Sequence, residues 1–151
     1  MTQDWGPHTW KMFHTLVNKV KPEYFNEVKN DLIYFITHIS YSLPCPYCSS
    51  HARRYFKKIK INSLHTKDDV IKMVFNFHNN VNNRLKKPIF SYDDLNKTYD
   101  HENTIQVVNT FVNRYSISSR RTNLFYIALS CKELLSKFIN WFQSNLHAFE
   151  K

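Results

Sequence analysis

The most reactive side chains in this sequence belong to two cysteines that are separated by two residues. Cys45 and Cys48 enclose the stretch Cys-Pro-Tyr-Cys, and His51 follows three residues later. Thiols at this spacing can hold a metal ion, or they can form a disulfide that exchanges electrons with other thiols. Because Cys131 stands far along the chain with no other cysteine near it in sequence, we expect the chemistry at Cys45 and Cys48.

A zinc site is the first alternative for this pair. Structural zinc takes four ligands in a tetrahedron, and Cys45, Cys48 and His51 supply three of them. No second ligand pair follows at a familiar spacing, so His65 or Cys131 would have to complete the site. A second alternative needs no chemistry, since two unlinked thiols can simply fill space at the start of a helix.

The third alternative is a redox-active disulfide. Pro46 suits the first position of a helix, which places Cys48 in the first turn, where free amide groups and the helix dipole favour a thiolate. Arg53 and Arg54 add positive charge nearby. A thioredoxin-like enzyme would need β-strands, and the sequence pattern predicts none. The electrons would therefore have to leave by another route.

The elements that position the cysteines are predicted to be helices throughout. Apolar residues recur at three- and four-residue steps, and no segment alternates with a period of two. Pro7, Pro22 and Pro46 suit helix starts, and Thr66 with Asp69 resembles a capping box. The expected helices cover about residues 5–20, 22–42, 46–60 and 65–87, a short stretch after residue 91, and two more from about residue 102 that are separated at 116–121.

Composition excludes several kinds of nucleotide site and partner. The chain has 151 residues, enough for one domain with a hydrophobic core, and Gly6 is its only glycine, which excludes glycine-rich phosphate loops. Although the net charge is +9, the basic residues come in short pairs typical of exposed helix faces, so we expect no nucleic-acid partner. With no signal peptide and no apolar run that could span a membrane, a cytoplasmic location is expected.

The predicted helix before Pro88 carries polar groups on the face that should be buried. His78 and Asn82 share that face, and Asn79 adjoins it. Buried polar groups need hydrogen-bond partners, which an adenine ring and a pyrophosphate could provide, as could a polar contact between helices. The apolar residues expected on the same face are Val70, Val74, Phe77, Val81 and Leu85.

Three segments together resemble a known family. Trp-Gly-Pro-His-Thr-Trp-Lys-Met-Phe-His near the start, Cys-Pro-Tyr-Cys followed by His51, and His-Asn-Asn-Val-Asn ahead of Leu-Lys-Lys-Pro are similar to the flavin-dependent sulfhydryl oxidases of the Erv/ALR type. The similarity covers roughly residues 4–100 and is closest to the short forms of large cytoplasmic DNA viruses. It implies an all-α fold, in which residues 1–100 form a four-helix bundle with a short fifth helix that binds FAD. Residues 101–151 would add a C-terminal extension of two helices packed on the bundle.

The resemblance also implies roles for individual residues. Cys45 would be the outer cysteine of a redox disulfide, and Cys48 would lie against the flavin ring. Lys86 replaces a usual glycine, which leaves the conformation of that turn open, and Tyr99 stands where a tryptophan often packs the adenine. The residues expected to bind FAD are Gly6, Thr9, Trp10, His14, His51, His78, Asn79, Val81, Asn82, Lys86, Lys87 and Tyr99.

The implied activity is the formation of disulfides in protein substrates, with oxygen reduced to hydrogen peroxide. Because the chain lacks a second C-x-x-C, substrates should reach Cys45 directly, and a small redox protein with its own C-x-x-C is the expected partner. Cys131 is expected to be buried and inert. A homodimer is also implied, located in the host cytoplasm at the site of virus assembly or in the virion. The alternative from another class is a zinc-stabilised helical module that binds acidic partners.

Overall fold

The fold is built from helices, as the apolar periodicity predicts. The computed structural model describes residues 4–121 and 125–151, and in this part the only strand-like feature is an isolated antiparallel bridge between Val20 and Phe149. The α-helices are α1 (Gly6–Lys19), α2 (Phe25–Tyr41), α3 (Pro46–Phe56), α4 (Lys67–Arg84), α5 (Leu95–Tyr99), α6 (Thr104–Arg120) and α7 (Phe125–Ser144). Short 3-10 turns lie at Pro22–Tyr24, Ile61–Ser63, Tyr92–Asp94 and Leu146–Ala148. The all-α class is confirmed.

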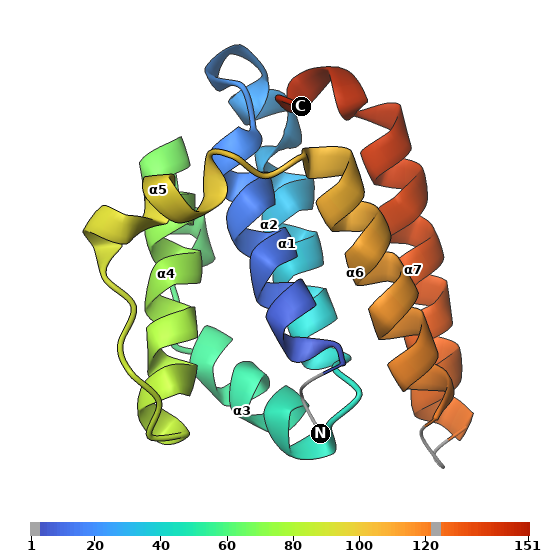
Figure 1. The fold of residues 1–151 in the computed structure, drawn as a ribbon. Coiled ribbons are helices and arrows are strands. Elements are labelled where there is room, and N and C mark those ends of the chain that lie inside the picture. The colour runs from blue at the N-terminus through green and yellow to red at the C-terminus, as the bar shows by residue number, and fades with distance from the viewer. Residues whose placement is uncertain (1–3, 122–124) are drawn as a thin grey trace.

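Helix α1 lies at the centre of the molecule. It packs against α4 and α5 on one side and α6 on the other, while α2 packs against α3 and α7 (Figure 1). Phe13, Leu16 and Val17 of α1 are almost completely buried in this core. Helix α3 runs across one end of the bundle, the end at which α1 begins (Figure 1). The disulfide motif is therefore held against the end of a packed core.

The local signals that begin the helices act as expected. Pro7 and Pro46 occupy the first turns of α1 and α3, where a missing N–H is tolerated. Thr66 and Asp69 form a reciprocal capping box at the start of α4, which confirms that prediction. Helix α3 ends at Phe56, four residues before the predicted end, and α2 begins at Phe25 after a 3-10 turn.

Two details of the prediction are wrong. The break expected at residues 116–121 does not occur there, because α6 continues to Arg120. Ser119 is buried and its hydroxyl donates to the carbonyl of Tyr115 one turn earlier, so this serine is accommodated inside the helix. Leu85, expected on the buried face of α4, is 43% exposed because the helix has already ended at Arg84.

The two C-terminal helices are tied to the rest of the fold by hydrogen bonds as well as by packing. The Tyr115 hydroxyl of α6 and the Cys131 thiol of α7 both donate to the carbonyl of Ser42, in the loop that leads to Cys45. At the other end of the extension, the amide of Glu150 donates to the carbonyl of Lys19. Cys131 is buried, as predicted. No helix among the described residues is both long and apolar enough to cross a membrane.

Candidate functional site

Cys45 and Cys48 form a disulfide at the start of α3. Cys45 is the N-cap residue and Pro46 opens the helix, so the backbone turns just enough to bring the two Cα atoms to 5.2 Å. Both cysteines are half-buried. Because each sulfur is bonded to the other, neither is free as a zinc ligand, and no three His, Cys, Asp or Glu side chains gather for a metal in residues 4–121 and 125–151. The zinc alternative finds no support.

The start of α3 acts on the sulfur of Cys45. The backbone N–H of Cys48 donates to Cys45 Sγ at 3.2 Å, so the sulfur takes the place of the oxygen of an ordinary N-cap residue. The sequence places the favoured thiolate at Cys48, whereas this hydrogen bond goes to Cys45. Once the disulfide is reduced, the amide and the helix dipole stabilise a thiolate on Cys45.

A cavity of about 460 Å³ adjoins the other cysteine, Cys48. Helices α1, α3, α4 and α5 all contribute to its walls, and the loop residue Leu43 closes it beside the disulfide. Its position explains why polar residues interrupt the apolar face of α4, because they face this cavity rather than the hydrophobic core. The predicted residues that line it are Gly6, Thr9, Trp10, Cys48, His51, His78, Val81, Asn82, Lys87 and Tyr99.

Four predicted residues lie outside the cavity wall. Cys45 does not line the cavity although it is bonded to Cys48, and Lys86 is exposed at the end of α4. The amide of Asn79 donates to the carbonyl of Phe90 and accepts from its N–H, both at 2.8 Å, so Asn79 holds the segment after α4 in place. His14 lies behind the wall, against two residues that line it. A contact of Asn79, Lys86 or His14 with a cofactor stays a prediction.

The polar part of the cavity is organised by a pair of buried histidines. His14 Nε2 and His78 Nδ1 are 2.8 Å apart, the ring of His78 stacks on Trp10 at 4.1 Å, and His14 stacks on Tyr99 at 4.8 Å. Burial lowers the pKa of His14 to about 3, helped by His78. Burial also lowers the pKa of His78 to about 4, helped by Lys87. Both rings are therefore neutral near pH 7, and one donates its N–H to the other.

Burial also keeps the remaining titratable rings of the cavity uncharged. It raises the pKa of Tyr99 to about 12, with a contribution from the Glu102 carboxylate. Burial lowers the pKa of His51 as well, and the Arg84 guanidinium is the next cause. The wall thus presents flat neutral rings, while Arg84 and Lys87 supply positive charge, and Lys11 adds a charge that is paired with Glu102 at 3.1 Å.

Arg84 is the main residue that the sequence analysis missed. Its Nε and Nη1 atoms are buried without a hydrogen-bond partner, and its guanidinium lies 4.8 Å from the centre of the Tyr47 ring. Helical spacing could have identified it, because Arg84 stands three residues after Val81 and seven after Phe77, which both line the cavity. Trp5, the first residue of the segment that resembles the family, also lines the cavity, as do Leu43 and Thr98, which carry no sequence signal that we recognise.

The turn after α4 brings Lys87 to the cavity. Lys86 has a left-handed backbone with φ of 56°, the conformation for which glycine is usually selected. The amide of Lys87 donates to the carbonyl of Asn82, and the amide of Lys86 donates to that of Asn83, as in a Schellman helix end. Lysine therefore adopts the turn that the family glycine would make, and it carries the steric penalty of its Cβ.

Replacing Lys86 with glycine is therefore expected to raise the free energy of unfolding by about 0.5–1 kcal/mol. The steric penalty of a Cβ in the left-handed backbone is removed, and the greater flexibility of glycine in the unfolded chain offsets this gain only in part. Lys86→Ala is the matched control, since it removes the charge and keeps the Cβ. The free energies of unfolding from urea titrations measure both. An equal change in the two variants would show that the charge, and not the backbone, decides the effect.

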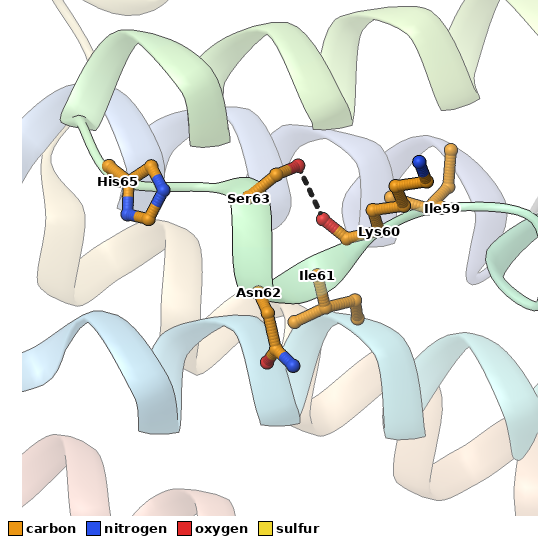
Figure 2. Close-up of a pocket in the computed structure, with 6 residues that line it drawn as sticks. All are labelled: Ile59, Lys60, Ile61, Asn62, Ser63 and His65. Atoms are coloured by element: carbon orange, nitrogen blue, oxygen red, sulfur yellow. Dashed lines mark hydrogen bonds between the residues drawn. The ribbon is translucent and has the colours of Figure 1, made fainter.

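A second, shallow pocket lies along the loop from Ile59 to His65 (Figure 2). Its volume of about 590 Å³ exceeds that of the cavity beside Cys48, but it is open to solvent and contains neither cysteine nor any residue predicted to bind FAD. The Ser63 hydroxyl donates to the carbonyl of Lys60 at 2.7 Å and stabilises the 3-10 turn (Figure 2). We assign the functional site to the cavity at Cys48, because there a cysteine of the disulfide lies in a concave wall together with most of the residues predicted to bind FAD.

Comparison with known proteins agrees with this assignment. The sequence model of the Erv1 / Alr family matches residues 7–103, which span α1 to the end of α5 and include the disulfide and the cavity. No solved structure matches the chain.

Viral proteins are among the relatives. An FAD-linked sulfhydryl oxidase of African swine fever virus (isolate Tick/Malawi/Lil 20-1/1983) is 33% identical over 115 residues, which cover 74% of this chain and 96% of the relative. The protein of the same name from isolate Warthog/Namibia/Wart80/1980 is 34% identical over 96 residues, 64% of this chain and 80% of the relative. A relative from Invertebrate iridescent virus 6 is 31% identical over 91 residues. From the extent of the family match and of these alignments, this chain belongs to the Erv1/Alr family.

Proposed function

We propose that this chain is an FAD-dependent thiol oxidase, which forms disulfides in protein substrates and passes the electrons to oxygen. The observation that carries the proposal is a disulfide whose inner cysteine, Cys48, lines a cavity walled by aromatic rings, in a member of the Erv1/Alr family. The viral relatives are named FAD-linked sulfhydryl oxidases. Thiol oxidation needs an exchangeable disulfide next to a group that accepts two electrons, and this arrangement has room for both.

The residues of the cavity fit FAD. Its volume of about 460 Å³ falls within the range of about 300–1,000 Å³ that is usual for pockets of organic ligands. Trp10, Phe77 and Tyr99 offer ring faces against which flat aromatic groups can stack, and Asn82 and His78 offer polar groups. FAD, when bound here, supplies the chemistry that takes two electrons from a dithiol and delivers them to oxygen.

Arg84 gives the strongest indication that an anionic group belongs in the cavity. Two nitrogens of this guanidinium are buried without a hydrogen-bond partner, which is unfavourable because they have lost water, and the contact with the Tyr47 ring supplies no acceptor for them. A pyrophosphate would accept hydrogen bonds from these groups and neutralise the charge. Lys87, on the same cavity wall, would add a second positive charge. We therefore propose Arg84 and Lys87 as the residues that hold the phosphates of FAD.

Replacing Arg84 with methionine is expected to weaken FAD binding by at least about tenfold, because a charged hydrogen bond contributes about 1.5–3 kcal/mol. The apoprotein should be no less stable, since the variant removes a buried charge that lacks a partner. Lys58→Met is the matched control, because Lys58 is also basic but is exposed and does not line the cavity. Flavin fluorescence titrations give both affinities. Equal weakening by the two variants would contradict a specific role for Arg84.

The reaction at the cysteines is an exchange of disulfides. A substrate thiolate attacks Cys45 Sγ, a bond between the two sulfurs forms, the Cys45–Cys48 bond breaks, and its electron pair leaves on Cys48. A second substrate thiolate then attacks the substrate sulfur of this mixed disulfide and releases Cys45 as a thiolate. The substrate has lost two electrons and two protons, and Cys45 and Cys48 are left reduced. Cys48 then lies at the cavity wall, where the electrons can leave.

The N-cap position of Cys45 favours the second of these steps. The departing Cys45 thiolate accepts the N–H of Cys48 and lies at the positive end of the α3 dipole, so it is a good leaving group. Release of the oxidised substrate is thereby favoured over return to the mixed disulfide. The same hydrogen bond is charge-assisted once Cys45 is a thiolate, which strengthens it.

We also propose the finer features that the family resemblance implies. They are an oxidase domain of residues 1–100 with an extension of residues 101–151, a homodimer, and a small protein dithiol with its own C-x-x-C as the substrate. For the location we propose the host cytoplasm at the site of virus assembly, or the virion. Because α6 and α7 already cover α1 and α2, a dimer would have to form on another surface of the bundle. Sedimentation equilibrium tests the dimer, and a single species at the mass of one chain would contradict it.

The experiment that tests the proposed function is direct. The purified protein, supplied with FAD, should retain the flavin after gel filtration and consume oxygen when dithiothreitol is added. It should release hydrogen peroxide in proportion to the oxygen consumed. A protein that retains no flavin but contains one zinc ion per chain would support the helical binding module instead and would refute the oxidase.

A further inference from the structure

A second cavity lies next to residues that flank the disulfide in the sequence, although neither Cys45 nor Cys48 lines it. It has a volume of about 340 Å³ and lies between the end of α2, the first turns of α3 and the start of α7. Leu43 and Pro46, which flank Cys45 in the sequence at positions −2 and +1, both line it, and Leu43 also lines the flavin cavity. We call it the α3–α7 groove.

We propose that the α3–α7 groove binds the segment of the protein substrate that carries the attacking cysteine, and that it selects segments with acidic side chains next to that cysteine. The proposal rests on the thiol oxidase function proposed above. It goes beyond that function because it assigns a binding surface and a chemical class of partner. It also gives the C-terminal extension a part in substrate recognition.

The position of the groove is the first argument. Pro46 and Ser49 belong to the turn of α3 that carries the disulfide, so a chain bound in the groove passes directly beside Cys45. A docked thiolate can then form the bond to Cys45 Sγ while the Cys45–Cys48 bond breaks with its electrons on Cys48. Holding the reacting sulfur near its target in this way raises the rate of a bimolecular exchange. The flavin cavity cannot serve this purpose if it contains FAD.

The charge of the groove is the second argument. Arg53 is the only charged residue among those that line it, and no Asp or Glu lines it. Residues 32–67 contain no Asp or Glu at all, whereas residues 53–60 contain Arg53, Arg54, Lys57, Lys58 and Lys60. The Arg53 guanidinium is held on the ring of Tyr41, 5.2 Å from its centre, and donates to the carbonyl of Tyr41 at 3.3 Å. A fixed cation in basic surroundings favours an acidic segment over a basic one.

The C-terminal extension supplies one wall, which is the third argument. Ser130 of α7 lines the groove. Tyr115 of α6 donates a hydrogen bond to the carbonyl of Ser42, which also lines the groove. The family match ends at residue 103, so this wall lies outside the part of the chain that the family shares. The extension therefore offers a specificity element added to a common oxidase domain.

The test uses the full-length protein with FAD and two reduced peptides that each contain one C-x-x-C. The peptides differ only in their flanking residues, which are Glu in one and Gln in the other. We expect the value of kcat/KM to be about threefold to fivefold higher for the acidic peptide at low salt, as one exposed ion pair allows. The preference should decrease as salt approaches 0.15 M. Equal values for the two peptides would overturn the proposal.

Two pairs of variants identify the surface. Arg53→Gln should remove the preference for the acidic peptide, whereas Lys58→Gln, a loss of the same charge on an exposed residue outside the groove, should retain it. Ser130→Trp should fill the groove and lower kcat/KM for both peptides by about tenfold or more, while Leu129→Trp, its exposed neighbour outside the groove, should not. Equal effects within either pair would overturn the proposal.

Dithiothreitol oxidation separates this proposal from the function on which it rests. Wild-type protein that does not oxidise dithiothreitol would refute the oxidase and the groove together. Wild-type protein that oxidises dithiothreitol and both peptides equally would refute only the groove. In Ser130→Trp, the loss with the peptides should exceed the loss with dithiothreitol, because the small dithiol does not need the groove. Equal losses with all three substrates would also refute it.

Discussion

Replacing Cys48 with serine is expected to abolish thiol-dependent oxygen consumption and to leave FAD bound. Cys48 is the cysteine that lines the flavin cavity, so its sulfur is the atom from which electrons can leave the disulfide. Serine cannot form or exchange a disulfide, and Cys131 is buried with its thiol bonded to the carbonyl of Ser42, so no other thiol can take over. The turnover number should fall by about 10³-fold or more. An oxygen electrode measures the rate, and flavin absorbance measures the bound cofactor.

Two further variants make this result specific. Cys45→Ser should abolish turnover equally, because substrates attack Cys45 first. Cys131→Ser, in which the hydroxyl can keep the hydrogen bond to Ser42, should retain turnover within about a factor of two and shows the effect of losing an inert cysteine. Retention of more than a tenth of the wild-type rate by Cys48→Ser would contradict the assignment of Cys48 as the exit for electrons.

The Cys48→Ser variant should also capture the natural partner. Its free Cys45 can attack the disulfide of an oxidised partner, form a mixed disulfide and release one partner thiol, and Cys48 is no longer present to reverse the bond. The captured protein can be identified by mass spectrometry after non-reducing electrophoresis. A partner rich in Asp and Glu beside its C-x-x-C would agree with the charge of the α3–α7 groove.

The sequence predicts the helical frame well because strong local signals mark it. Pro7 and Pro46 can occupy only the first turn of a helix, and the Thr66–Asp69 capping box is a reciprocal pair that few other structures would satisfy. The ends are less well predicted. The end of α3 and the continuation of α6 through Ser119 depend on tertiary contacts and on a hydrogen bond within the helix, which residue type alone does not reveal.

In the candidate site, too, some residues could be predicted from the sequence and others could not. His78 and Asn82 could be recognised because they interrupt an apolar stripe on a helix of known phase, and both line the cavity. Arg84 has the helical spacing of a cavity residue, but an arginine near a helix end is usually exposed, so the spacing alone did not single it out. Which sulfur accepts the N-cap hydrogen bond, here that of Cys45 and not that of Cys48, depends on the backbone of the preceding loop. Sequence patterns therefore identify which side chains are unusual, whereas packing decides which of them meet.

The buried pair of His14 and His78 is expected to make the protein sensitive to acid. In the unfolded chain both pKa values are near 6.5, and in the folded chain they are about 3 and about 4. Below pH 6.5 the unfolded chain therefore binds more protons than the folded chain, and the free energy of unfolding falls as the pH falls. The loss is at most about 1.4 kcal/mol per pH unit for each histidine, and it ends below the folded pKa values. Well above pH 6.5, where the histidines of the unfolded chain are neutral as well, the pair has no effect on the pH dependence.

Between pH 6.5 and pH 5 the two histidines together should lower the free energy of unfolding by about 2–4 kcal/mol, a large share of the 5–15 kcal/mol of a typical domain. Urea titrations of the apoprotein at several pH values measure this slope. The double variant His14→Gln with His78→Gln should lose most of the slope, because its amides can hydrogen-bond to each other and do not titrate. His65→Gln, which replaces an exposed histidine, should keep it. If the free energy of unfolding had the same pH dependence in the wild type and the double variant, burial would not be holding the two rings neutral. The account of the cavity as a set of uncharged rings beside basic side chains would then be wrong.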